Sequence, residues 1–264
     1  MPRYSANLSF LFGELTFLER IDAAAQSGFR GVEYASPYEH DLAEITRRLR
    51  AGGLEQVLFN LPMGDAAAGE RGYASDPSRI DEFRRGVGAA LAIARELNCA
   101  RINCLTGIAV AGLDPALARE TLVRNLHYAA RGCAEAGITL LVEPLNRIDT
   151  PGFLIGTTAE ALALIDEVGA PNLKLQYDCY HAQRSEGNIL ATLHAQIGRI
   201  AHVQIADSPK RNEPGTGELA YERILPELDA LGYEGWVGLE YKPSRSTLDS
   251  LSWLDALRPH EVAS

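Results

Sequence analysis

Short apolar runs alternate with amphipathic, helix-like segments along the whole 264-residue chain. The strands predicted from the apolar runs are Tyr4–Ser9, Gly31–Tyr34, Glu55–Asn60, Arg101–Leu105, Ile138–Glu143, Leu173–Asp178, Ile200–Ala206 and Trp236–Tyr241. The helices predicted after them are Thr16–Ser27, Asp41–Ala51, Asp76–Asn98, Asp114–Ala136, Thr158–Val168, Ile189–Gln196, Tyr221–Leu231 and Ser246–Arg258. Strict strand–helix alternation with right-handed crossovers builds an open parallel sheet or a closed barrel, and eight units favour closure. The sequence therefore predicts an α/β fold, a (β/α)8 TIM barrel forming one domain over residues 1–264.

Size, charge and cysteine usage narrow the class of protein. A barrel of 264 residues with 46% hydrophobic composition can bury one large core. The formal charge of −10, with no basic patch, argues against a nucleic-acid partner. No apolar stretch approaches the ~20 residues of a membrane span, and no signal peptide is evident. The four cysteines form no CxxC pair, which favours a reducing, cytoplasmic location. Homo-oligomerisation is compatible with all of these features.

Four polar residues stand at the ends of the last four predicted strands. They are Glu143, Asp178, Gln204 and Glu240, separated by 35, 26 and 36 residues. Each gap holds about one βα unit of roughly 30 residues. Because side chains two apart along a strand share a face, all four are expected to point into the barrel at one rim. One such residue would as easily cap a helix, but four in register favour a common site.

Oxygen ligands of this kind suit Mg²⁺ or Mn²⁺ better than a structural zinc, which prefers thiolates. With four protein ligands, an octahedral ion keeps two positions for an α-hydroxycarbonyl substrate. Glu143 and Glu240, which come from different strands, are then positioned to act as acid and base. His181, three residues after Asp178, is a candidate donor to a substrate oxygen. His202 is interpreted as an inward residue that supports the site rather than a ligand.

Basic residues on the same rim are candidates for binding an anionic substrate. Arg71, with Glu70 beside it, lies in the long loop Leu61–Ser75, whose length is typical of a lid. Arg211 lies in the loop after the seventh strand, where Glu213 is expected to orient it, and Lys242 shares the inward parity of Glu240. Arg71, Arg211 and Lys242 are the predicted partners of a substrate carboxylate, because a guanidinium or ammonium group forms charge-assisted hydrogen bonds with it.

Motifs along nearly the entire chain resemble the hydroxypyruvate isomerase family of xylose-isomerase-like barrels. The matching segments are ANLSFLF (6–12), GERGYASDP (69–77), LVEPLN (141–146), LKLQYDCYHAQRSEGN (173–188), HVQIADSPKRNEPGTGELAY (202–221) and GLEYKP (238–243). The resemblance implies that Glu143, Asp178, Gln204 and Glu240 bind one divalent ion and that the two glutamates exchange a proton through an enediolate. It also implies that His181 helps to hold the substrate. The implied substrate is a small anionic 2-oxo hydroxy acid, hydroxypyruvate or a 2-oxo-tetronate.

Three other functions are compatible with parts of this pattern. A ketose 3-epimerase or a dehydratase of the same barrel would share the metal site, although an epimerase is expected to present His rather than Gln at position 204. A DNA-repair nuclease would need more histidines and a basic face than this chain offers. A sugar-acid binder without catalysis would not need two glutamates at the metal. The sequence favours the isomerase.

Overall fold

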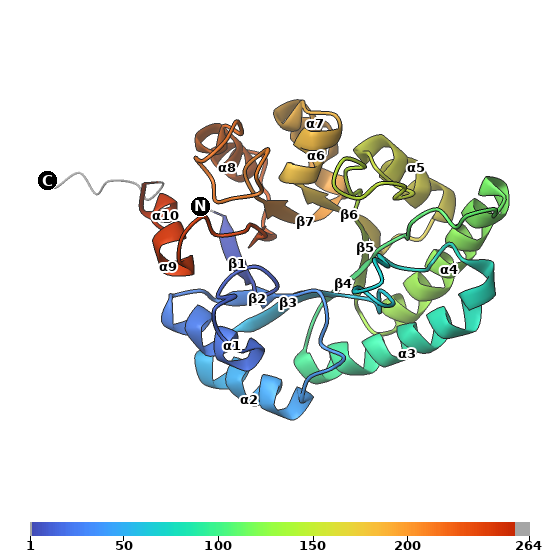
Figure 1. The fold of residues 1–264 in the computed structure, drawn as a ribbon, viewed down its shortest axis with the longest axis horizontal. Helices are drawn as coiled ribbons and strands as arrows, with labels where there is room; N and C mark the ends of the chain where they lie inside the picture. Colours follow the sequence, from blue (N-terminus) through green and yellow to red (C-terminus); the bar gives the residue numbers. More distant parts are fainter. Residues whose placement is uncertain (1, 257–264) are drawn as a thin grey trace, which may run out of the picture.

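The computed structural model describes residues 2–256, which form a closed barrel of parallel strands surrounded by helices (Figure 1). Each strand pairs with its neighbour in chain order, and β1 closes the barrel against β8. The strands are β1 (Arg3–Asn7), β2 (Gly31–Glu33), β3 (Glu55–Asn60), β4 (Arg101–Cys104), β5 (Thr139–Val142), β6 (Leu173–Asp178), β7 (Ile200–Ile205) and β8 (Trp236–Leu239). The predicted fold class is confirmed.

Helices cover the outside of the barrel and bury one apolar face against it. The α-helices are α1 (Phe17–Gln26), α2 (Leu42–Gly52), α3 (Ile80–Leu97), α4 (Pro115–Glu135), α5 (Thr158–Val168), α6 (Cys179–Ser185), α7 (Ile189–Gln196), α8 (Tyr221–Ala230), α9 (Thr247–Ser250) and α10 (Trp253–Ala256). Helix α4 begins as predicted, because the Asp114 side chain accepts a hydrogen bond from the Ala116 amide and Pro115 occupies the first turn. Asp76 instead caps a short 3₁₀ turn, Pro77–Arg79, which leads into α3.

Two helix predictions differ from the structure. No helix is predicted between Asp178 and Ile189, yet α6 follows β6 directly there. The side chain of Asp178 caps α6 by accepting from the Tyr180 amide. The predicted helix Ser246–Arg258 is divided into α9 and α10 within the described residues, and Arg258 lies outside them. Both helices lie beside the barrel near β1 (Figure 1).

The barrel interior is apolar toward the amino-terminal ends of the strands and polar toward their carboxyl-terminal ends. A compact apolar cluster contains Val57, Leu58, Leu141 and Trp236. Further along the strands the buried side chains become polar; they include Asn7, Glu33, Asn103, Gln176, Asp178, His202 and Gln204. Polar groups are rarely buried without a purpose, since each needs a hydrogen-bond partner. The polar layer at the carboxyl-terminal ends of the strands is therefore the candidate functional region of the barrel.

The cysteines and helices agree with the limits set by the sequence. The four cysteines, all within the described residues, are buried and unpaired. None of the helices in the described part of the chain is long and apolar enough to cross a membrane.

Candidate active site

Three carboxylates and one imidazole converge at the carboxyl-terminal end of the barrel. Glu143 follows β5, Asp178 ends β6, His181 lies in the first turns of α6, and Glu240 follows β8. One potential ligand atom from each lies within 4.8 Å of those from the other three. Glu143, Asp178 and His181 are buried, whereas the side chain of Glu240 is 16% exposed. A closed barrel thus brings together residues almost a hundred positions apart in the sequence.

The two glutamates of the cluster, Glu143 and Glu240, hold protons more tightly than isolated carboxyl groups do. Burial, followed by the charges of Glu240 and Asp178, raises the pKa of Glu143 well above its ordinary value. Burial and the Asp178 charge likewise raise the pKa of Glu240 to about 8, although the Arg211 guanidinium opposes the shift. Carboxyl groups with pKa values near neutrality are suited to general acid–base catalysis.

The same cluster fits a divalent cation. Several negative oxygens gathered in a buried space repel one another, and a cation bound among them would remove that repulsion. The donors are mainly oxygens, which is the preference of Mg²⁺ and Mn²⁺. A buried Glu, Asp and His cluster that can hold a metal ion is therefore present where the sequence predicted one.

Gln204, the fourth predicted ligand, lies in β7 directly opposite Asp178 of β6. Its amide nitrogen donates to Glu33 over 2.7 Å, and its amide oxygen accepts from Gln176 over 2.7 Å. The oxygen therefore faces β6, the strand that supplies Asp178. Its part as a metal ligand stays a prediction.

His181 has a defined proton position. Its Nδ1 accepts a hydrogen bond from the backbone N–H of Asn146 at 3.1 Å, so the ring proton must reside on Nε2 when the ring is neutral. Burial lowers the pKa of His181 to about 4, despite the opposing charge of Asp178. Nε2 lies 3.7 Å from a carboxylate oxygen of Asp178. The imidazole consequently offers an N–H donor toward the cluster, and its contact with a substrate oxygen stays a prediction.

Arg211 is the basic residue that the structure brings to the cluster. Its guanidinium forms an ion pair with Glu240 and lies 3.4 Å from Asp178. The rings of Phe10 and Tyr180 lie 4.8 and 5.1 Å from the guanidinium carbon, so the side chain packs against two aromatic rings. Its backbone φ of 59° lies in the left-handed region, a strained conformation for arginine. Strain of this kind is typical of a residue placed for function.

The other predicted substrate-binding residues are not brought to the cluster. The Arg71 guanidinium donates to backbone carbonyls of its own loop, at Ala66 and Glu70. The carboxylate of Glu70 instead accepts from Arg79. The side chain of Lys242 is exposed, because β8 ends at Leu239 and strand parity does not extend to it.

The prediction that Glu213 orients Arg211 is wrong. The Glu213 carboxylate accepts hydrogen bonds from the backbone and hydroxyl of Ser244 instead. Glu213 therefore ties the loop after β7 to the loop after β8.

Several residues of the site were missed by the sequence analysis. Asn103 donates to Glu143 at 3.0 Å and to Asn60 at 3.2 Å, and Asn7 donates to Glu240 at 3.0 Å. Glu33 accepts from Gln204 and contacts the ring of His202, whose nitrogen lies 2.9 Å away. Despite complete burial, the charge of His202 and these hydrogen bonds lower the pKa of Glu33. Each of the missed residues belongs to one of the first four strands, close to its carboxyl-terminal end. That position is the signal the sequence offers for them, but it does not indicate their partners.

The long loop Leu61–Ser75 contains turns and no helix or strand. Part of it borders a cavity of about 690 Å³ that is also lined by Ser36 and Tyr38, which follow β2. At Gly72, φ is 93° and an added Cβ would lie 2.1 Å from the carbonyl oxygen of Leu105, so the loop packs closely against the segment after β4. The predicted lid therefore lies on the same rim as the cluster, and its closure stays a prediction.

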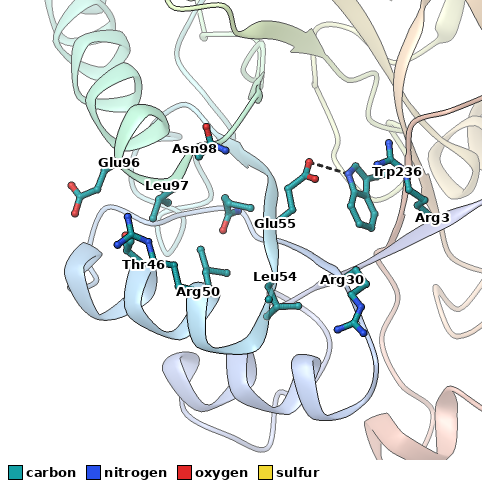
Figure 2. A pocket seen from close by; sticks show the side chains of 13 residues that line it. Arg3, Arg30, Thr46, Arg50, Leu54, Glu55, Glu96, Leu97, Asn98 and Trp236 are labelled. Carbon is teal, nitrogen blue, oxygen red and sulfur yellow. Dashed lines mark hydrogen bonds between the residues drawn. The ribbon is translucent and has the colours of Figure 1, made fainter.

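A second cavity of about 690 Å³ lies at the opposite, amino-terminal end of the barrel (Figure 2). Arg50 lies beside Thr46 on one side of it, whereas Arg3 and Arg30 lie on the other side near Trp236. The indole of Trp236 donates to Glu55 at 3.1 Å. The arginines that line this amino-terminal cavity do not converge on one point (Figure 2). TIM barrels place catalysis at the carboxyl-terminal face. The carboxylate cluster is therefore the stronger candidate.

Comparison with known proteins places the chain in a family. Residues 21–257 match the family model described as the xylose isomerase-like TIM barrel. The chain is 50% identical over 258 residues to hydroxypyruvate isomerase of Escherichia coli (strain K12), covering 98% of this chain and 100% of that protein. It is 46% identical over 254 residues to 2-oxo-tetronate isomerase of Cupriavidus necator, covering 96% and 98%. The chain therefore belongs to the xylose isomerase-like TIM barrel family, as the resemblance in its motifs predicted.

One solved structure is similar over the full length but carries a different name. The structure described as AP endonuclease, family 2, from Brucella melitensis matches with a TM-score of 0.94 at 45% identity. The match covers 98% of this chain and 100% of that one.

Proposed function

We propose that this protein is an isomerase for a small 2-oxo acid with a hydroxyl on the neighbouring carbon. The substrates are hydroxypyruvate, which it would interconvert with tartronate semialdehyde, or a 2-oxo-tetronate. In both cases the carbonyl and hydroxyl exchange places between the second and third carbons, so one site chemistry serves either substrate. The observation that carries the proposal is the pair of glutamates, Glu143 and Glu240, whose pKa values are raised within one cluster.

Glu143, Asp178, Gln204 and Glu240 would hold one divalent cation, Mg²⁺ or Mn²⁺. When bound, such an ion polarises a carbonyl and makes the adjacent C–H more acidic. The oxygen-rich donor set supports this choice of metal. His181, whose ring nitrogen facing the cluster carries a proton, would contact the substrate rather than bind the metal.

The residues of the chain would then divide the reaction between them. One glutamate removes the proton from the hydroxyl-bearing carbon, which gives an enediolate. The hydroxyl proton passes to the former carbonyl oxygen, and the other glutamate delivers a proton to the former carbonyl carbon. His181 donates its Nε2–H to a substrate oxygen, and Arg211 holds the carboxylate of the acid. Arg71, Glu70 and Lys242 remain candidates that would need loop movement to reach the same substrate.

Turnover in D₂O tests the proton transfer. A carboxylate that has taken a proton can exchange it with solvent, so deuterium should enter the carbon that becomes hydroxyl-bearing in the product. The metal-stripped protein in the same buffer controls for spontaneous exchange. Glu143→Gln and Glu240→Gln should each lower kcat by roughly 10²–10⁴-fold, because an amide can offer an oxygen to a metal but cannot accept the proton. Substantial activity in both variants, together with full retention of hydrogen, would rule out this route.

The same preparations separate the rival functions. The charge of −10 does not favour the nuclease named for the Brucella melitensis structure. Cleavage of abasic-site DNA with no isomerisation would overturn the proposal in favour of that rival. Epimerisation of a neutral ketose, with no activity on 2-oxo acids, would favour the epimerase. A cytoplasmic location is part of this proposal and is supported by four buried, unpaired cysteines.

A further inference from the structure

Glu33, at the end of β2, is a fully buried carboxylate in the layer below the cluster. One of its oxygens receives hydrogen bonds from the Ser5 hydroxyl at 2.7 Å and contacts the His202 nitrogen at 2.9 Å. The other receives the Gln204 amide at 2.7 Å and the Asn7 amide at 3.2 Å. Three hydrogen-bond donors and one imidazole nitrogen, all from β1 and β7, thus surround one side chain.

This arrangement defines what Glu33 can do. A carboxylate offers about four acceptor positions. Here three of them accept hydrogen bonds and the His202 ring nitrogen lies against the fourth. No oxygen of Glu33 is left to coordinate a metal or to accept a proton from a substrate. Apart from its charge, which adds to the effect of burial on the pKa of Glu240, Glu33 therefore acts on the site through the groups that donate to it.

Gln204 is the group most constrained by Glu33. Because a carboxylate only accepts hydrogen bonds, the Gln204 nitrogen must face it and the Gln204 oxygen must face the other way. That oxygen receives one hydrogen bond from Gln176, which leaves a second lone pair available. We propose that Glu33 is a positioning residue that fixes the Gln204 amide with its oxygen available as a metal ligand and, through Asn7, aligns Glu240. This inference rests on the metal site of the proposed function.

Space for the Glu33 carboxylate depends on a glycine. An added Cβ at Gly238 would lie 2.3 and 2.5 Å from the two Glu33 oxygens. Gly238 also stands opposite Gln204 in the pairing of β7 with β8. A side chain at position 238 would displace Glu33 from Gln204. Glycine at this position of β8 is therefore required for the contact between Glu33 and Gln204.

Metal affinity, rather than activity, tests the proposal. Mn²⁺ binding to the chelator-treated full-length protein is measured by calorimetry, with circular dichroism confirming the fold of each variant. Glu33→Met removes all acceptors at similar length and should weaken Mn²⁺ binding by about 10–100-fold, as expected for a residue that orients a ligand. Ser5→Ala, which removes one donor but keeps the Gln204 contact, should change it by less than about threefold.

A double-mutant cycle separates orientation from charge. If Glu33 acts through Gln204, Glu33→Met should have little further effect in a Gln204→Ala background. The same loss in both backgrounds would show a general effect of charge or folding and would overturn the proposal. Glu33→Asp, which keeps the charge but withdraws the carboxylate, provides the same cycle if the methionine variant does not fold.

The outcome also distinguishes this inference from the proposed function. A wild-type protein that binds no Mn²⁺ or Mg²⁺ would overturn both. A protein that binds Mn²⁺ with the predicted Glu33–Gln204 coupling, yet does not isomerise 2-oxo acids, would support the positioning role while refuting the proposed substrate. Wild-type affinity in both Glu33 variants would refute the positioning role alone.

Discussion

The two halves of the barrel supply different chemistry to the same site. Strands β5–β8 and the residues directly after them provide the candidate ligands Glu143, Asp178, Gln204 and Glu240. Strands β1–β4 instead provide Asn7, Glu33, Asn60 and Asn103, which contact those ligands or one another. Strands β5–β8, the ligating half, would bind the metal. Strands β1–β4, the orienting half, position the residues that bind it.

The difference has an electrostatic reason. Three carboxylates already crowd the cluster, so a further negative group facing it would add repulsion among the carboxylates and favour their protonated forms. Asparagine side chains donate hydrogen bonds to Glu143 and Glu240 without adding charge. Glu33, the acidic residue ending a strand in the orienting half, instead faces the ring nitrogen of His202 at 2.9 Å. Changes in the two halves should therefore differ in kind and in size.

The largest effect is expected at the center of the ligating half. Asp178→Ala removes a candidate ligand that also caps α6 through the Tyr180 amide. We expect loss of detectable Mn²⁺ binding and at least a 10³-fold loss in kcat/KM, with the barrel still folded. Metal analysis, kinetics and circular dichroism measure the three properties. A metal-free preparation with full activity would contradict the division between the halves.

Charge recognition gives the next comparison. Arg211 follows β7 and lies at the cluster, whereas Arg71 follows β3 and binds its own loop. Arg211→Ala should raise KM for the 2-oxo acid by about 10–150-fold, which corresponds to the 1.5–3 kcal/mol of a charge-assisted hydrogen bond. A neutral α-hydroxycarbonyl compound should be little affected.

Arg71→Ala and Lys242→Ala serve as matched controls in the same assay. Each removes a positive charge on the same rim, but neither side chain reaches the cluster in the structure. A larger effect from Arg71 than from Arg211 would show that the long loop closes over the substrate and would assign recognition to the orienting half.

Much of this arrangement was predictable from the sequence, for a physical reason. Strand periodicity located each barrel strand to within a few residues, and the strand-end rule located the cluster because parallel strands in a barrel all end at one rim. Parity failed at Lys242, since alternation holds only while the strand continues and β8 ends at Leu239. The sequence did not predict α6, because this helix begins without any intervening turn after β6.

The orienting half was harder to predict. Asn7 and Asn60 end their strands, and Asn103 is the second-last residue of β4. All three are neutral, and asparagine near a strand end commonly belongs to a turn. The role of Glu33 depends on contacts with β1 and β7, which are remote in sequence. Only the closed barrel brings these partners together.

The proton content of the ligating half predicts how metal binding depends on pH. The pKa of Glu240 is raised to about 8 and that of Glu143 is raised well above normal, so the metal-free site holds protons at neutral pH. A cation must displace them, and its affinity should rise by up to about tenfold per pH unit for each proton, reaching a plateau above the raised pKa values. Calorimetry at several pH values measures this dependence.

The stability of the metal-free protein should change in the opposite direction. A carboxyl group whose folded pKa is raised binds more protons in the folded than in the unfolded state between its ordinary value and its raised value. Stability therefore decreases as the pH rises through that interval, up to about 8 for Glu240. The melting temperature without metal should fall between pH 6 and pH 8, while the added stabilisation by Mn²⁺ grows. An affinity independent of pH would show that the cluster is already ionised.

The smallest effects are expected in the orienting half, graded by distance from the ligands. Asn103 donates directly to Glu143, whereas Asn60 accepts a hydrogen bond from Asn103 and is linked to Glu143 through it. Asn103→Ala should lower kcat by about tenfold, near the lower limit for a hydrogen bond to a charged group, and Asn60→Ala by about threefold, as for a neutral pair. If Asn60 acts through Asn103, the double variant should lose no more than Asn103→Ala alone. Additive losses would show that Asn60 reaches the substrate by itself, and equal losses from both single variants would contradict the graded arrangement of this half.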